Sequence, residues 1–149
     1  MSLTLPTLPD GRVLDVVRAP SRVLSASGSA VDPADPAVVQ LCADLVTTMR
    51  ISPGCVGLAA PQVGVSARVF CVDVSSHPKT RTTHGLIVLV NAEIVEASRN
   101  EKAREGCMSV PELTGDVKRA TKITVAGLLP LSGERLLITS DAFEARALQ

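Results

Sequence analysis

A cysteine with reactive neighbours stands in the segment Glu105-Gly106-Cys107-Met108-Ser109. A carboxylate and a glycine precede it, and a hydroxyl follows it two residues later. Cysteine in this company has three interpretations: a thiolate ligand for a metal ion, a nucleophile, or a small buried apolar residue. The segment alone is compatible with all three interpretations, which differ in the residues elsewhere in the chain that would accompany Cys107.

A second segment, 57–64 (GLAAPQVG), places one polar side chain, Gln62, among small residues and turn formers. Two further candidates, His77 and His84, lie in the polar segment 75–85 among Pro, Lys, Arg and Thr residues. Their spacing does not fit a pair of metal ligands on one helix. The sequence therefore favours exposed loop histidines over metal ligands.

Composition narrows the class of protein. The 149 residues are expected to form one domain, 1–149, and the 15 basic and 15 acidic side chains cancel. A neutral chain carries no direct signal for nucleic acid or an anionic membrane surface, and its longest apolar run is too short to cross a bilayer. Its four cysteines form no CxxC pair, and no basic and apolar leader opens the chain. Free thiols in a reducing compartment are predicted.

The elements that must position these residues are a long early helix and several strands. Asp35-Pro36 is typical of a helix start, apolar residues then recur at three and four, and 52–54 (SPG) ends the pattern. Cys42 lies on the apolar stripe and is predicted to pack in the core. Strands are predicted at 68–74, which contains Cys71 as a second core thiol, and at 86–95, 123–129 and 135–139.

The remaining segments connect these elements. Residues 1–33 are rich in proline and glycine and are expected to run extended, with a short pairing segment at 13–17. A polar turn is predicted at 98–104. Asp141 and Glu144 have the spacing of a capping box for a last helix, which is barely two turns long when the sequence stops. One long helix, short antiparallel strands and a terminal helix predict an α+β domain, with antiparallel sheets packed around helices.

GLAAPQ at 57–62 and EGCMS at 105–109, in this order and about 45 residues apart, resemble the first two signature motifs of the peptide deformylases. Those enzymes remove the formyl group from the N-terminal methionine of newly made bacterial and organellar proteins. The early helix and the segments 68–74, 86–98 and 110–125 are also similar to that family. One departure stands in the first motif, because Cys55 occupies a position where glycine is usual; packing is its favoured role.

The resemblance implies a third motif, HExxH, directly after a segment similar to 145–149. Two histidine ligands and a catalytic glutamate are therefore expected beyond Gln149. The expectation from the sequence is a deformylase-like domain that is C-terminally incomplete, with its metal-binding helix cut short. Without those residues, whether this form is an active enzyme is left open.

The resemblance also assigns roles to residues that are present. Cys107 would ligate a divalent metal, Fe²⁺ or Zn²⁺ with Ni²⁺ also compatible, if the missing helix is present. The expected catalytic groups are Gln62 and the backbone N–H of Met108 as hydrogen-bond donors to the formyl oxygen, and Glu105 as a residue that orients the site. The expected substrate-binding residues are Gly57, Leu58 and Gly106.

Three functional hypotheses follow. The first is metal-dependent deformylation of an N-formylmethionyl peptide or nascent chain in the bacterial cytoplasm, by a chain whose sequence continues. The second is an inactive deformylase-like protein that binds peptides and lacks the metal site. The third makes Cys107 the nucleophile of a Cys-His amide hydrolase, but the sequence offers no histidine in a plausible position for the base.

Overall fold

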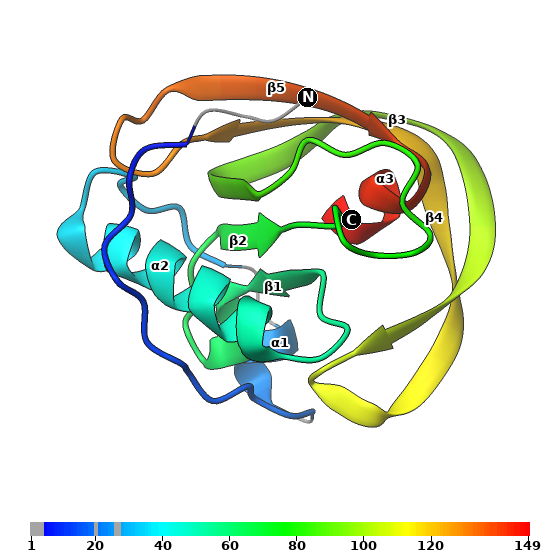
Figure 1. Ribbon diagram of the computed structural model, residues 1–149, viewed down its shortest axis with the longest axis horizontal. Helices are drawn as coiled ribbons and strands as arrows, with labels where there is room; N and C mark the ends of the chain where they lie inside the picture. The colour runs from blue at the N-terminus through cyan, green and yellow to red at the C-terminus, as the bar shows by residue number, and fades with distance from the viewer. Residues whose placement is uncertain (1–4, 20, 26–27) are drawn as a thin grey trace.

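A computed structural model describes residues 5–19, 21–25 and 28–149 of the chain. They form a five-stranded antiparallel sheet in the order β1-β2-β3-β4-β5, accompanied by α-helices (Figure 1). This arrangement confirms the α+β class. The elements are α1 (Arg22–Ser25), α2 (Pro36–Ile51), β1 (Gly57–Ala59), the 3₁₀ helix η1 (Ala60–Val63), β2 (Val69–Val72), β3 (Ile87–Cys107), β4 (Val110–Leu128), β5 (Arg135–Asp141) and α3 (Ala142–Leu148). Among the helices described, none is long and apolar enough to cross a membrane.

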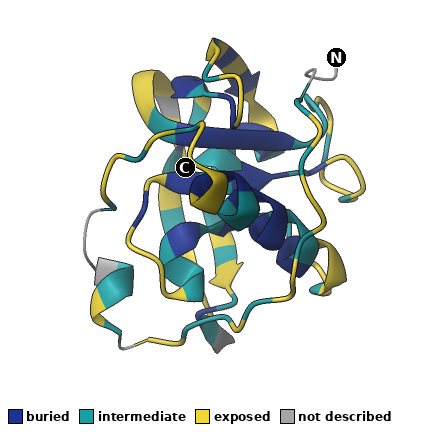
Figure 2. Ribbon diagram, turned by 90° about the vertical axis from the view of Figure 1, so that its left-hand side faces the viewer, coloured by how far each residue is buried: buried dark blue, intermediate teal, exposed yellow. Residues whose placement is uncertain are grey.

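Helix α2 begins and ends where the sequence predicts. The Asp35 carboxylate accepts a hydrogen bond from the N–H of Ala37 at 2.9 Å, and proline occupies the first turn. The apolar face of the helix packs on β1 and β2, and Cys42 and Cys71 are both fully buried there. The buried positions are dark blue in Figure 2 and turn toward the interior. Both predicted core thiols are confirmed.

Strands β3 and β4 are much longer than predicted, and the expected turn at 98–104 is wrong. That segment lies inside β3, and the chain reverses only after Cys107. Residues of opposite charge occupy partner positions at Glu101↔Arg119 and Arg104↔Asp116, whereas two lysines face each other at Lys102↔Lys118, so the pairing is held by its backbone hydrogen bonds. Irregularities in the pairing bend β3, and the ribbon curves around α3 (Figure 1).

The N-terminal segment forms no strand at 13–17, contrary to the prediction. Its backbone instead bonds to polar side chains on α2: the N–H of Arg12 donates to Asp44 at 2.7 Å, and the N–H of Leu14 donates to Thr48 at 2.9 Å. Side chains of α2 therefore satisfy the backbone donors that a neighbouring strand would have used.

The start of α3 also differs from the sequence prediction, because no capping box forms. Asp141 occupies the N-cap position, but its carboxylate accepts from the Thr82 hydroxyl at 2.8 Å and makes no hydrogen bond to the helix backbone. Glu144, the other half of the predicted box, bonds to His84. Thr82 and His84 both lie in the loop between β2 and β3. Contacts with a loop about 60 residues away thus replace the local pattern.

Ala142, the first residue of α3, has a φ of 50°, which lies in the left-handed region that glycine adopts without steric cost. We expect Ala142→Gly to raise the free energy of unfolding by about 1 kcal/mol, because it relieves this strain. Urea denaturation measures the effect. Ala145→Gly, inside the same helix, is the matched control and should lower stability by a similar amount; a loss of stability in both variants would contradict the expectation.

Candidate active site

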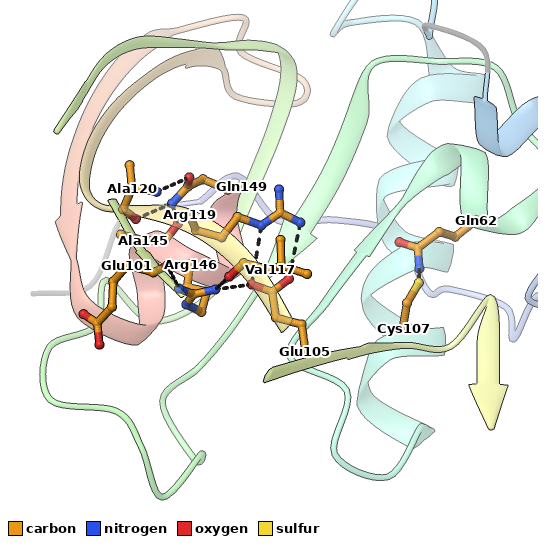
Figure 3. A network of polar contacts seen from close by, with 10 residues as sticks. All are labelled: Gln62, Glu101, Glu105, Cys107, Val117, Arg119, Ala120, Ala145, Arg146 and Gln149. Carbon is orange, nitrogen blue, oxygen red and sulfur yellow. Dashed lines mark hydrogen bonds and ion pairs between the residues drawn. The ribbon is translucent and has the colours of Figure 1, made fainter. Parts of the chain in front are cut away.

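The two segments that the sequence singles out lie side by side. The Gln62 side-chain amide donates a hydrogen bond to the Cys107 sulfur at 3.3 Å, joining η1 to the end of β3 (Figure 3). Cys107 is solvent-exposed and carries no disulfide. The structure therefore brings together an accessible thiol and an amide that are 45 residues apart in the sequence.

A second contact determines which end of the Gln62 amide faces Cys107. The backbone N–H of Ala59 approaches the other end of that amide at 3.0 Å. An N–H can only donate, so the atom that it meets must be Oε1. The NH₂ group of Gln62 is consequently held toward Cys107, as a fixed hydrogen-bond donor.

Strand β1 presents backbone groups at one edge of the sheet. The N–H of Asp73 donates to the carbonyl of Val56, and antiparallel pairing alternates, so the backbone groups of Gly57 and Ala59 point away from β2. Because β1 is the terminal strand of the sheet, these groups lie on its outer edge. The Gly57 carbonyl accepts a weak hydrogen bond from the Cys55 thiol at 3.2 Å.

Leu58 and Gly106 are also expected at the substrate site, and the structure shows no direct role for a side chain at either position. The Leu58 side chain is 2% exposed and packs in the core, so it affects a ligand only by fixing the position of β1. Gly106 faces Thr114 across the β3–β4 pair, and a Cβ at this position would meet Thr114 Cγ2 at 3.5 Å, an ordinary contact. The fold itself therefore does not require glycine at 106.

Met108 and Ser109 form the tight turn between β3 and β4. The N–H of the first turn residue takes no part in the hydrogen bond that closes such a turn, so the N–H of Met108 can bind an outside acceptor. The Ser109 carbonyl accepts from the N–H of Ala19, while the N–H of Val17 donates to the carbonyl of Gln62. The N-terminal segment thus bonds to both sides of the site.

Glu105 is held by two arginines. Its carboxylate lies 2.6 Å from Nη1 of Arg146 on α3 and 3.3 Å from Nη2 of Arg119 on β4 (Figure 3). Arg146 also donates to the carbonyl oxygens of Val117 and Glu101. A bridged carboxylate of this kind fixes the backbone that carries it, and Glu105 precedes Cys107 by two residues. The two arginines were not predicted from the sequence.

Gln149 fixes the other end of α3. Its side-chain amide both accepts from the N–H of Ala120 at 2.9 Å and donates to the carbonyl of Ala120 at 2.6 Å (Figure 3). Strand β5 pairs with β4 only as far as Lys122, so the amide occupies the place of the next paired residue. Helix α3 is thereby joined to the strand pair that carries Cys107.

The four thiols differ in their environments. Burial raises the pKa of Cys42 and of Cys71 to about 12. Burial also raises the pKa of Cys55, with the hydrogen bond to Gly57 acting in the opposite direction. These three thiols stay protonated near neutral pH, which leaves the exposed Cys107 as the accessible candidate for metal binding.

A cavity of about 400 Å³ lies at the C-terminal end of α2 and is bordered by Arg50, Cys55, Asp73 and His77, among others. Neither Gln62 nor Cys107 lines it. The candidate site is therefore defined by the contacts between η1, β1 and the β3–β4 turn, and not by this cavity.

Comparisons with known proteins show the family of this chain. The family of polypeptide deformylases matches residues 13–149 of the chain. The chain belongs to this family. It is 41% identical over 137 residues to the peptide deformylase of Carboxydothermus hydrogenoformans, covering 92% of this chain and 84% of that protein. The peptide deformylase of Halothermothrix orenii has the same identity and coverage.

Solved deformylase structures share the fold. The Met-Ala-Ser-bound enzyme of Acinetobacter baumannii has a TM-score of 0.83 at 33% identity, covering 93% of this chain and 91% of that one. The Ehrlichia chaffeensis enzyme in complex with actinonin has a TM-score of 0.82 at 32% identity, covering 92% and 80%. The resemblance of the two sequence motifs to deformylases is confirmed.

Deformylases depend on a metal ion, which needs several side-chain ligands placed close together. Cys107 fits as one ligand, because its thiol is exposed and free. Within the described ranges, no group of three or more His, Cys, Asp or Glu side chains is placed to hold a metal ion. Among these described residues, Cys107 is therefore a candidate ligand without further candidate ligands grouped beside it.

The histidines have other roles. His77 stacks on Phe143 with ring centroids 4.3 Å apart, and His84 Nδ1 lies 2.6 Å from the carboxylate of Glu144. Both lie in the loop between β2 and β3 as predicted, but they are partly buried against α3, so the expected exposure is wrong. The hydrogen bond of the Cys107 thiol is with Gln62, and neither imidazole is its base. The Cys-His hydrolase hypothesis has no support in this geometry.

Glu144 makes the stability of this deformylase sensitive to acid. Burial opposes its charge, but hydrogen bonds from the His84 N–H, the Ser140 hydroxyl and the His84 ring outweigh this effect and lower the pKa of Glu144. A lowered folded-state pKa adds stability above about pH 4.3, the ordinary value for glutamate, and this stability is lost as pH falls through the folded pKa.

We therefore expect Glu144→Gln to reduce the free energy of unfolding most at pH 7 and progressively less below about pH 4.3. Urea denaturation at several pH values between 7 and 3 measures the difference. Asp73, whose pKa is also lowered, is present in both proteins and cancels. Glu134→Gln removes an exposed carboxylate and is the control; a gap between Glu144→Gln and wild type that does not change with pH would contradict the sign.

Proposed function

We propose that this chain removes the formyl group from the N terminus of formylmethionyl peptides, as a peptide deformylase. Membership of the family supports the reaction, and the oriented NH₂ group of Gln62 is the observation that ties it to this chain. Hydrolysis of a formamide develops negative charge on the formyl oxygen. Donors that are already fixed toward that oxygen lower the barrier, because they need no reorganisation during the reaction.

Each site residue has a separate role in this proposal. The Gln62 amide and the Met108 N–H donate to the formyl oxygen, and the Glu105 carboxylate, held by Arg119 and Arg146, keeps the end of β3 in position. The Cys107 thiolate is one metal ligand. A divalent metal bound there would supply an activated water.

We propose that the substrate main chain lies along the outer edge of β1. The Gly57 carbonyl points away from β2, and its present partner is the Cys55 thiol, a weak donor that a peptide N–H displaces readily. The Met-Ala-Ser ligand of the Acinetobacter baumannii enzyme supports a peptide substrate. The finer assignments are Fe²⁺ or Zn²⁺, with Ni²⁺ also compatible, and the bacterial cytoplasm, where formylated nascent chains are made.

The test is formate release from formyl-Met-Ala-Ser, with Fe²⁺, Zn²⁺ or Ni²⁺ added under anaerobic conditions. The intact mass of the polypeptide is measured first, since the 149 residues amount to 15.5 kDa and the result must be assigned to a chain of known extent. Metal-dependent formate release is the expected result. Full metal occupancy without formate release would overturn the proposal.

The alternative function is that of a deformylase-like protein that binds formylated peptides without hydrolysing them. Saturable binding of formyl-Met-Ala-Ser by a protein that retains no metal would support this alternative.

A further inference from the structure

Hydrogen bonds between His84 and the buried carboxylate of Glu144 attach the loop between β2 and β3 to helix α3. The Glu144 carboxylate is 1% exposed, and it accepts from the His84 backbone N–H at 2.6 Å and from the Ser140 hydroxyl at 2.7 Å. His84 Nδ1 lies 2.6 Å from the same carboxylate. Three hydrogen bonds to one buried carboxylate define its position closely, because a buried charge without partners is costly.

The same loop contacts α3 at two further points. His77 stacks on Phe143, and the Thr82 hydroxyl donates to the Asp141 carboxylate. The strained residue Ala142 lies between these contacts, and left-handed backbone of this kind persists only where its surroundings hold it. Figure 1 shows the loop, in green, passing around the red helix α3. The loop thus sets the position of the start of α3.

Helix α3 connects this loop to the candidate site. Two residues after Glu144, Arg146 holds Glu105 at 2.6 Å, and Glu105 precedes Cys107 by two residues in β3 (Figure 3). Cys107 in turn accepts the hydrogen bond from Gln62. A continuous series of contacts therefore joins His84 to the candidate site, through a helix that is anchored on both sides.

We infer that His84 and Glu144 are positioning residues for deformylation: through α3 and Arg146 they set the place of Glu105, and so the alignment of Cys107 with Gln62. This inference rests on the proposed function. Neither residue contacts the site itself, and their effect should therefore fall on kcat and not on peptide affinity. A misplacement of reacting groups by about 1 Å from a distant substitution costs about 100-fold, so a partial shift is expected to cost about 10-fold.

The experiment compares His84→Ala, His84→Asn and Glu144→Gln with wild type in the full metal-loaded enzyme, at a temperature where each variant is folded. Asparagine can donate a hydrogen bond near the place of Nδ1. We expect His84→Ala and Glu144→Gln to lower kcat about 10-fold with KM within about twofold, and His84→Asn to restore most of the rate. Glu134→Gln is the control for an exposed carboxylate.

A second readout does not depend on turnover. In metal-free protein, the NMR signals of the Gln62 side-chain amide and the Met108 N–H should move in His84→Ala and return toward wild type in His84→Asn. Unmoved signals together with an unchanged kcat would overturn the inference, because the pair would then affect only stability. A wild-type protein that releases no formate would instead contradict the proposed function, and the NMR shifts would still decide the role of His84.

Discussion

Cys107→Ala should leave the protein folded while removing both retained metal and formate release. Cys107 is exposed, so its loss should change the free energy of unfolding by no more than about 0.5 kcal/mol. If its thiolate is a ligand, however, the metal loses a bond that no neighbouring side chain in the described ranges replaces. Substitutions that only support a ligand cost about 10- to 100-fold in metal affinity, and removal of the ligand itself should cost more.

Metal content of the purified variant and formate release with added metal measure this effect. Cys42→Ala is the matched control, because it removes a fully buried thiol and should lower stability without changing metal content. Retained metal in Cys107→Ala would refute the assignment of Cys107 as a ligand. If chelators left activity unchanged while alkylation of Cys107 abolished it, a nucleophilic role would replace the metal-binding one.

The sequence predicts that 57–62 and 105–109 act together, and the contact between Gln62 and Cys107 places these segments side by side. The sequence predicts this association because each motif is a short continuous segment with its residues at fixed spacing. The catalytic and ligand roles of these residues stay predictions. Cys55 was expected to pack, and the structure adds that its thiol bonds to the Gly57 carbonyl.

The rest of the site depends on distant contacts. Glu144 has the spacing of a capping box, but its carboxylate bonds to His84, which lies 60 residues earlier in the chain. A single sequence does not show which of two polar partners a carboxylate chooses when one is local and the other is brought close by folding. The same limit applies to Glu105, whose partner Arg146 is 41 residues away.

The long strands were missed for a related reason. Residues 98–104 are polar, and without a partner strand they are typical of a turn. In the structure their backbone pairs with β4, where Arg119 lies opposite Glu101 and Asp116 lies opposite Arg104. The backbone hydrogen bonds of this pairing hold the polar segment in the strand without an apolar face. This pairing register depends on the strand that follows the turn, and no property of 98–104 alone reveals it.

Gln62→Leu tests the remaining half of the proposed centre. Leucine has no hydrogen-bond donor, so kcat should fall about 100- to 1000-fold, as for other fixed donors to a developing oxyanion. Metal content should stay near that of wild type, because the amide is assigned to the formyl oxygen and not to the metal. Leucine also leaves the Ala59 N–H without its acceptor, and a loss of rate could therefore reflect a shifted β1.

Gln62→Glu separates these two effects. A carboxylate still accepts from the Ala59 N–H but has no NH₂ group to offer the substrate. If the donor is what matters, Gln62→Glu should lose kcat as severely as Gln62→Leu, while its free energy of unfolding stays closer to that of wild type. Equal losses of metal and turnover in both variants would instead place Gln62 among the groups that hold the metal. Turnover near the wild-type level in Gln62→Glu would make the contact with Ala59 its main role.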